Sequence, residues 1–242
     1  MRWKRDFFVF SYFFILVIER TIVLLCGRVQ LTEARTISKN GRPRGQKTRD
    51  AILRRAVNIA SVEGLEGLTI GKLAALLKIS KSGLFAHFGS KEELQCAVVD
   101  EASRIFVEEV IRPANGTHGL KRLEMLCERW GLYAERRVFP GGCFFSAASL
   151  EFDDRPGKVR DRIVHCMNHW LLLLEDAVRE GQSSGEIRRD IGARQVAFEI
   201  HALAMGGNWR ARLFRDQTAF RLAGRAIFDR IREIAGATPA RK

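Results

Sequence analysis

The chain has 242 residues, 46% of them hydrophobic, and a formal net charge of +13. This length can bury one large core or two modest ones, and so basic a balance bears on the choice of partners rather than on the fold. The five cysteines are odd in number, widely spread and form no C-x-x-C pair, which argues against a disulfide framework or a zinc ribbon. We therefore expect reduced thiols in a cytoplasmic protein.

Residues 1–40 form an apolar extension that differs from the rest of the chain. Residues 7–18 are a continuous apolar run, but this run is shorter than the ~20 residues that a membrane-spanning helix needs. The basic start suits a signal peptide, although no small-x-small cleavage site follows. Two interpretations stay open: a membrane tether that uses residues 7–26, or an extension that is disordered or begins upstream of the native start. We prefer the second, so membrane association is not expected.

Positive charge is concentrated in the first third of the chain. Between Lys39 and Lys91 there are eleven lysines and arginines and three acidic residues, whereas from Glu101 onward there are 24 basic and 19 acidic residues. A surface that contacts phosphate groups needs such a concentration. An ordinary solvated basic face explains the charge equally well.

Helix signals begin at about residue 49. Apolar residues recur at helical spacing up to Gly64, which is a typical helix stop. Thr69 is a suitable N-cap for a short helix over residues 70–77. No window of the chain alternates with period two, so the prediction is an all-α fold without strands.

A second short helix follows a tight turn. Ser80 can cap it over residues 81–87, and a capping box at residues 90–93 starts a long helix that Pro113 stops. Two short helices joined by a tight turn in the basic region make a helix-turn-helix pattern, at about residues 69–88. An ordinary helical hairpin has the same local signals.

Three stretches carry a resemblance to a known family: Thr69-x-x-x-Leu73-Ala74, Ile-Ser-Lys-Ser-Gly-Leu-Phe-Ala-His-Phe at residues 79–88, and Ser-Lys-Glu-Glu-Leu at residues 90–94. Over residues 46–106 the chain resembles the N-terminal DNA-binding domain of the TetR-type (TetR/AcrR) transcriptional regulators. The resemblance implies a three-helix helix-turn-helix domain there, and a helical effector-binding and dimerisation domain over residues 107–236. It further implies a homodimeric, non-enzymatic repressor that a small ligand releases from a palindromic operator.

Within the resemblance, the recognition helix spans residues 81–87 and enters the major groove of double-stranded DNA. The implied DNA-binding residues are Thr69, Ser80, Lys81, Ser82, Gly83, Phe85, His87 and Lys91. Three positions depart from the usual family pattern, because Phe85 replaces a tyrosine, Gly83 a serine or threonine, and Lys78 a glycine of the turn. These departures concern the base contacts and not the fold.

Two further expectations concern the surroundings of this helix. Ile79, Leu84 and Phe88 should face the packed interior. Arg42 and Arg44, in the stretch Gly-Arg-Pro-Arg-Gly, resemble an arm that enters a narrow minor groove, whose negative potential attracts arginine. A flexible basic linker that touches only phosphate is an equal alternative.

The resemblance also makes aromatic residues of the second half candidate walls of an effector pocket. Residues 120–134 are amphipathic, a turn at residues 138–143 leads to an apolar helix up to about residue 152, and residues 156–181 contain an apolar run. The candidates are Trp130, Tyr133, Phe144, Phe145, Phe152 and Trp170. They predict a mostly apolar pocket and a lipophilic effector, unless they are simply hydrophobic core.

Two last helices, at about residues 193–214 and 218–234, match the dimerisation pair of the family. The candidate interface residues are Phe198, Ala202, Met205, Trp209, Phe220 and Ile227. Gly206 and Gly207 should let a partner helix approach closely. Two heads in a symmetric dimer suit a palindrome with half-sites about one duplex turn, or a multiple, apart.

Other sensor chemistries have weaker support. His165 and His169 are four residues apart on one helix, but no H-E-x-x-H pattern and no third metal ligand accompany them. Cys143 follows two glycines and could be a redox-sensing thiol, although no basic residue neighbours it in sequence. No metal, cofactor or catalytic residue is therefore expected.

Overall fold

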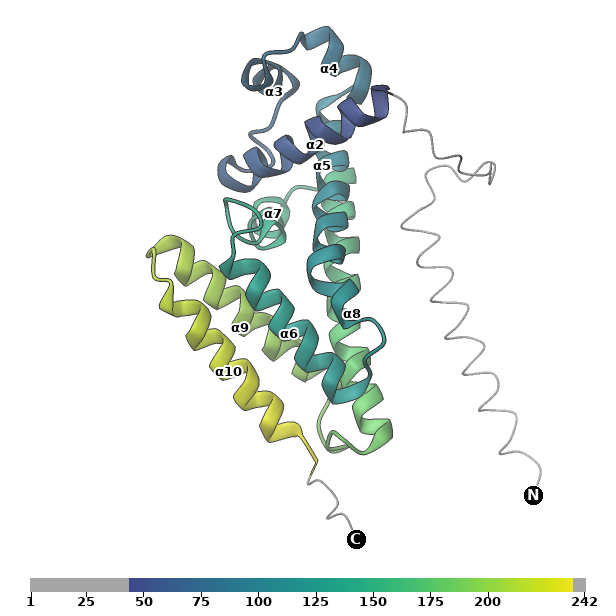
Figure 1. The fold of residues 1–242 in the computed structure, drawn as a ribbon, viewed down its shortest axis with the longest axis vertical. Helices are drawn as coiled ribbons and strands as arrows, with labels where there is room; N and C mark the ends of the chain where they lie inside the picture. Colours follow the sequence, from purple (N-terminus) through teal and green to yellow (C-terminus); the bar gives the residue numbers. More distant parts are fainter. Residues whose placement is uncertain (1–43, 237–242) are drawn as a thin grey trace, which may run out of the picture. The chain divides into compact units, whose positions relative to one another are not determined.

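The computed structural model describes residues 44–236, and they are helical as predicted (Figure 1). The elements in chain order are α2 (Arg44–Glu63), α3 (Ile70–Leu77), α4 (Lys81–Phe88), α5 (Lys91–Phe106), the π-helical turn η1 (Val107–Ile111), the 3₁₀ turn η2 (Arg112–Ala114), α6 (Gly119–Glu135), α7 (Phe144–Phe152), α8 (Lys158–Ser184), α9 (Ala193–Leu213) and α10 (Thr218–Ile234). Within these residues the only β pairing is an isolated antiparallel bridge between Ile187 and Ala235. The predicted extension over residues 1–40 lies outside the described part.

Three helices begin at the caps that the sequence predicts. The hydroxyls of Thr69, Ser80 and Ser90 each accept the backbone N–H of the residue three positions further on, at 3.0–3.1 Å. Each cap satisfies one of the N–H groups that a helix start leaves without a partner. The starts of α3, α4 and α5 are therefore set by chemistry within one helical turn.

The turn between α3 and α4 depends on a left-handed lysine. Lys78 has φ 54°, and the N–H of Ile79 then bonds to the carbonyl of Ala74 at 3.1 Å. This backbone conformation usually belongs to glycine, which has no Cβ to clash. The tight turn forms with lysine where glycine is expected.

Helices α2, α3 and α4 (residues 44–88) form a unit that we call the head. Its interior is apolar and almost fully buried, with Ala56, Leu65, Leu68, Leu73 and Leu84 at its centre. Leu84 and Phe88 face this interior as predicted. The prediction for Ile79 was wrong: its side chain is 39% exposed, because it lies in the turn and not on the inner face of a helix.

Helix α5 leads from the head into the remainder, residues 107–236, which we call the body. The predicted long helix runs without a break to Ala114, but only α5 is an α-helix. Its last turns are π-helical in η1 and 3₁₀ in η2, which contains Pro113. Proline has no N–H to donate, which ends the regular ladder. All described residues belong to one compact unit, so the predicted boundary between residues 106 and 107 lies inside a continuous helical stretch.

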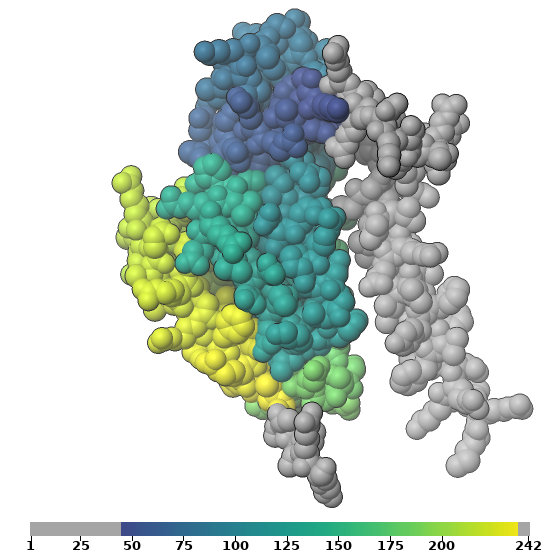
Figure 2. Space-filling view, in the orientation of Figure 1, coloured from purple at the N-terminus to yellow at the C-terminus, as the bar shows by residue number. Residues whose placement is uncertain are grey.

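The body is built around α8, which packs against α5, α6, α7 and α9. Figures 1 and 2 show α7 directly beneath α2, where the head meets the body. Helices α9 and α10 form a hairpin at one side of the body. Gly207 permits their close approach, since a Cβ there would lie 2.5 Å from the Cβ of Ala223. Its expected role toward a partner chain stays a prediction.

Among residues 44–236, no helix is both long and apolar enough to cross a membrane. The alternative of a membrane tether concerned residues 7–26, which fall outside the described range.

Candidate functional site

Helix α4 presents an exposed face above a buried one. Lys81, Ser82 and Gly83 are exposed, and the Phe85 ring is 57% exposed, whereas Leu84 is fully buried. Large aromatic side chains are usually covered in isolated domains. An exposed ring next to a lysine on a short, capped helix is a surface that is available to a partner.

The other predicted contacts of this region differ in availability. Thr69 and Ser80 are exposed, and both hydroxyl oxygens accept cap hydrogen bonds, while their hydrogens remain available to donate elsewhere. The Ser82 hydroxyl donates to Ser80 Oγ at 3.3 Å. His87 is half-buried beside Phe88, with ring centroids 6.2 Å apart.

Lys91 forms an ion pair with Glu66. Its ammonium lies 2.5 Å from Oε1 of Glu66, although the lysine side chain is 41% exposed. The hydrogen bond from Lys91 is the largest cause that holds the pKa of Glu66 below its usual value. A phosphate contact by Lys91 would therefore compete with Glu66, a pairing that the sequence does not reveal.

The head carries further exposed cations outside α4. Lys47, Arg54 and Arg55 are exposed on α2, and Lys78 is exposed in the turn. None of these four was among the predicted contacts. Helix α2 begins at Arg44, so the end of the predicted arm is helical backbone, whereas Arg42 is outside the described residues.

The candidate pocket residues all lie in the buried core of the body. Trp130, Tyr133, Phe144, Phe145, Phe152 and Trp170 are each at least nine-tenths buried. Sequence reasoning missed two neighbours, Phe106 and Phe139, which are also buried.

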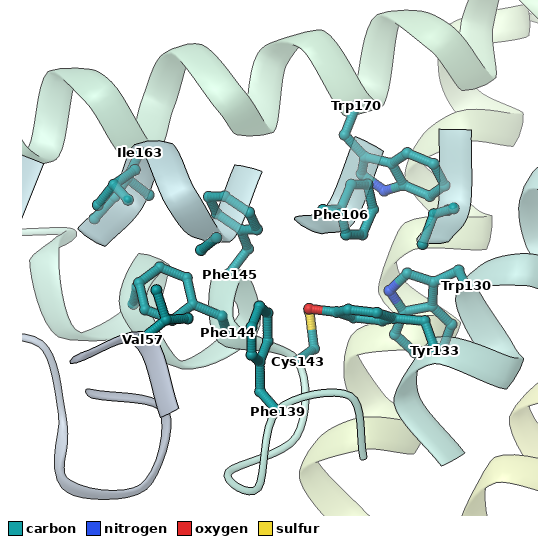
Figure 3. Packing of buried hydrophobic residues seen from close by; sticks show 14 of the residues in the cluster. Val57, Phe106, Trp130, Tyr133, Phe139, Cys143, Phe144, Phe145, Ile163 and Trp170 are labelled. Atoms are coloured by element: carbon teal, nitrogen blue, oxygen red, sulfur yellow. The ribbon is translucent and has the colours of Figure 1, made fainter. Parts of the chain in front are cut away.

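Phe106 is the centre of the aromatic cluster (Figure 3). Its ring packs edge-to-face at 5.4 Å from Tyr133, 6.1 Å from Phe145 and 5.2 Å from Trp170. Phe139 continues the chain of contacts, 5.8 Å from Tyr133. Edge-to-face pairs at these distances are favourable, so these side chains are tightly packed core in the present state.

One hydroxyl inside this apolar cluster has no partner. Tyr133 Oη is buried and makes no hydrogen bond of normal geometry, although the Cys143 thiol and the Phe144 N–H are near enough to influence its pKa (Figure 3). Burial raises the pKa of Tyr133 well above its usual value. Buried hydroxyls nearly always have a partner, so this oxygen is a position where a ligand atom would be stabilised.

The cysteines and histidines of the described region do not assemble a metal site. No group of three or more metal-ligating side chains occurs in residues 44–236. Burial raises the pKa of Cys127 to about 12 and also raises that of Cys96, which opposes thiolate formation. Cys143 is buried too, beside Tyr133.

An open apolar groove of about 820 Å³ runs between α9 and α10. Its lining includes Phe198, Ala202, Leu203, Gly206, Leu222 and Ala226. Phe198 is 64% exposed and Trp209, further along α9, is 55% exposed. An open apolar groove beside large exposed apolar side chains is a candidate interaction surface.

The predicted interface residues divide between this surface and the core. Ala202 is exposed, and Met205 and Phe220 are half-buried. Ile227 was wrongly placed, because it is only 3% exposed and belongs to the core of its own chain. Gly206 has no atom within 4 Å of a built Cβ and stays open to a neighbour.

Two family models match the chain. The one described as bacterial regulatory proteins, tetR family, matches residues 52–98, and the one described as tetracyclin repressor-like, C-terminal domain, matches residues 119–227. The HTH-type transcriptional repressor AcnR of Corynebacterium jeikeium (strain K411) is 28% identical over 165 residues, which are 64% of this chain and 76% of that protein.

Solved structures show the same fold. A TetR transcriptional regulator from Chloroflexus aurantiacus J-10-FL superimposes with a TM-score of 0.74 and 27% identity, covering 80% of this chain and 98% of that one. AibR, in complex with isovaleryl coenzyme A and operator DNA, has a TM-score of 0.61 and 21% identity, covering 74% of this chain and 95% of that one.

Proposed function

The chain belongs to the TetR family of bacterial regulatory proteins and is a DNA-binding transcription regulator; we propose that it is a dimeric repressor that a small lipophilic molecule releases from its operator. The observation that carries the proposal is the exposed face of α4, where Lys81, Ser82 and Phe85 stand on a basic head.

Helix α4 is the element that would enter the major groove. Helix α3 braces it against the DNA backbone, and the first residues of α4 reach the base edges. Phe85 can contact a thymine methyl group, but unlike tyrosine it cannot donate to a phosphate. The exposed cations of α2 and the turn supply the attraction to phosphates that is independent of sequence.

The partner in the groove between α9 and α10 would be a second copy of the chain. A two-fold dimer brings the same surface of each copy together, which suits a groove with an exposed Phe198 on one wall and Leu222 on the other. Charged residues at the edge, among them Arg230 and Glu199 at 2.6 Å, give the apolar strip a polar rim. Two heads would then read a palindrome.

The effector would enter the aromatic cluster around Phe106. The cluster is apolar, and the Tyr133 hydroxyl inside it lacks a partner, which favours a lipophilic molecule with at least one hydrogen-bonding atom. The rings would have to separate to admit it. AibR, which has this fold, has been solved with both isovaleryl coenzyme A and operator DNA; that pairing supports a ligand-responsive regulator here without identifying the ligand.

The full chain should be tested by selection from a random pool of duplex DNA, followed by titration of the enriched sequence at several salt concentrations. Lys81→Ala should weaken binding and reduce the salt slope by about one, because one phosphate contact is lost. Lys121→Ala, an exposed lysine on α6, is the control and should change neither. Enrichment of no sequence over random competitor would refute the proposal.

A further inference from the structure

A carboxylate of α7 is bound by the backbone of the head. Glu151 Oε2 accepts the N–H of Leu65 at 2.7 Å, and Oε1 accepts the N–H of Glu66 at 3.0 Å. Both donors belong to the turn after α2, where Gly64 adopts φ +87°. A carboxylate that accepts two N–H groups makes charge-assisted hydrogen bonds, which are stronger than neutral ones. Arg155 adds a surface ion pair to Glu66 at 3.7 Å.

A second contact lies just before α7. The N–H of Gly141 donates to Ser61 Oγ at 3.0 Å, near the end of α2. A Cβ at position 141 would lie 1.6 Å from the carbonyl oxygen of Ser61, so only glycine fits against this backbone. The loop before α7 and the far part of α7 thus both touch the end of α2.

The same segment also reaches the aromatic cluster and the groove helix. Phe144 and Phe145, in the first turn of α7, pack edge-to-face at 5.4 Å inside the cluster. The N–H of Cys143 donates to Asn208 Oδ1 of α9 at 3.3 Å. One short stretch of chain therefore contacts the head, the aromatic cluster and α9.

These contacts matter because the head has one covalent connection to the body within the described residues, namely α5. Ion pairs such as Arg162–Asp100 at 2.8 Å fix α5 to α8 but do not involve α2, α3 or α4. A single helix allows rotation about its axis and bending at its end. The turn after α2 is already bonded to α5, since Gln95 Nε2 donates to the Leu65 carbonyl at 2.8 Å. The contacts from α7 hold the same turn from a second element, and two points of attachment oppose both movements.

We propose that Glu151 and Gly141 are positioning residues that clamp the head onto the body, and that they thereby set the half-site spacing that the dimer reads on DNA. The spacing role rests on the dimeric repressor proposed above. A clamped head holds its recognition helix at one distance from the partner head, and half-site spacing follows from that distance. A released head accepts a wider range of spacings.

Two independent variants break the clamp. Glu151→Ala removes both acceptor oxygens, whereas Glu151→Gln retains one. Gly141→Ala places a methyl group against the Ser61 carbonyl. The controls are Glu128→Ala, an exposed acid on α6, and Gly131→Ala, a helical glycine of α6 with no atom within 4 Å of a built Cβ.

Amide hydrogen exchange of the full chain without DNA tests the contact itself. Exchange at Leu65 and Glu66 should accelerate about tenfold or more in Glu151→Ala, and less in Glu151→Gln, because the amides lose a charged acceptor. The controls should match the unmodified chain. Unchanged exchange at both amides in Glu151→Ala would overturn the clamp whatever the protein does with DNA.

Binding to palindromes with lengthened or shortened spacers tests the positioning role. The unmodified chain should show a sharp optimum, and Glu151→Ala and Gly141→Ala should broaden or shift it while binding to one isolated half-site is unchanged. Equal weakening at every spacing, with the profile preserved, would mean a merely structural role and would refute the proposal. If the unmodified chain prefers no sequence, the proposed function fails together with the spacing role, and the exchange result still decides the contact.

Discussion

Removal of the Tyr133 hydroxyl should stabilise the protein. A buried hydroxyl without a hydrogen bond costs roughly 1–3 kcal/mol relative to water, and Tyr133 Oη has no partner of normal geometry. The neighbouring Phe144 N–H compensates part of this cost. We therefore expect Tyr133→Phe to raise the free energy of unfolding by about 1 kcal/mol, the low end of that range. The edge-to-face contact with Phe106 needs only the ring, which phenylalanine retains.

The assay is urea denaturation of the full chain at fixed protein concentration, because dimerisation shifts the midpoint. In a thermal denaturation of the same samples, Tm should rise by roughly 2–4 °C for a gain of 1 kcal/mol in a protein of this size. Phe106→Ala serves as the control for a true core position and should destabilise by about 3–5 kcal/mol. A double-mutant cycle with Cys143→Ala should give almost no coupling energy. A loss of stability in Tyr133→Phe, or strong coupling to Cys143, would show that the hydroxyl has a native partner and that the reasoning is wrong.

Two further predictions concern the groove and an ion pair. Leu222→Asp places a charge in the apolar groove and should weaken dimerisation by tenfold or more in sedimentation experiments. The control is Leu172→Asp, at an exposed leucine of α8 outside the groove, which should leave dimerisation unchanged. Equal dimerisation of the two variants would contradict the groove as the dimer interface. Because Lys91 lowers the pKa of Glu66, the carboxylate stabilises the native state above the unfolded pKa, and this contribution is lost as pH falls through the native one. Between about pH 5 and about pH 3 the free energy of unfolding should therefore fall more steeply for the unmodified chain than for Glu66→Gln; parallel curves would contradict the pairing.

The helices and their starts could be predicted from the sequence to a large extent. Thr69, Ser80 and Ser90 each cap the helix that begins at the next residue by accepting the N–H three positions further on, and the interaction needs nothing beyond one turn of chain. The last helix occupies the predicted residues 218–234. The π-helical turn at Val107–Ile111 was not predicted, because no local signal distinguishes it from α-helix.

The candidate site could be predicted only in part. The family motif identifies α4, and the exposure of Lys81 and Phe85 agrees with that motif. The pairing of Lys91 with Glu66 joins residues 25 positions apart, and the central place of Phe106 in the aromatic cluster depends on contacts from α6, α7 and α8. Neither has a signature in the spacing of residues.

Which side of a helix meets water also depends on its neighbours. Ile227 and Phe198 are both apolar residues on amphipathic helices, yet one is core and the other is open in the groove. Gly206 and Gly207 are adjacent, but only Gly207 touches α10. The amino-acid order determined where the helices lie, their caps and the tight turn, because these depend on atoms within a few residues. Only the tertiary structure decided which side chains are buried, the pairing of Lys91 with Glu66 and the hydrogen bonds from the head to Glu151, since these depend on atoms brought together from distant segments.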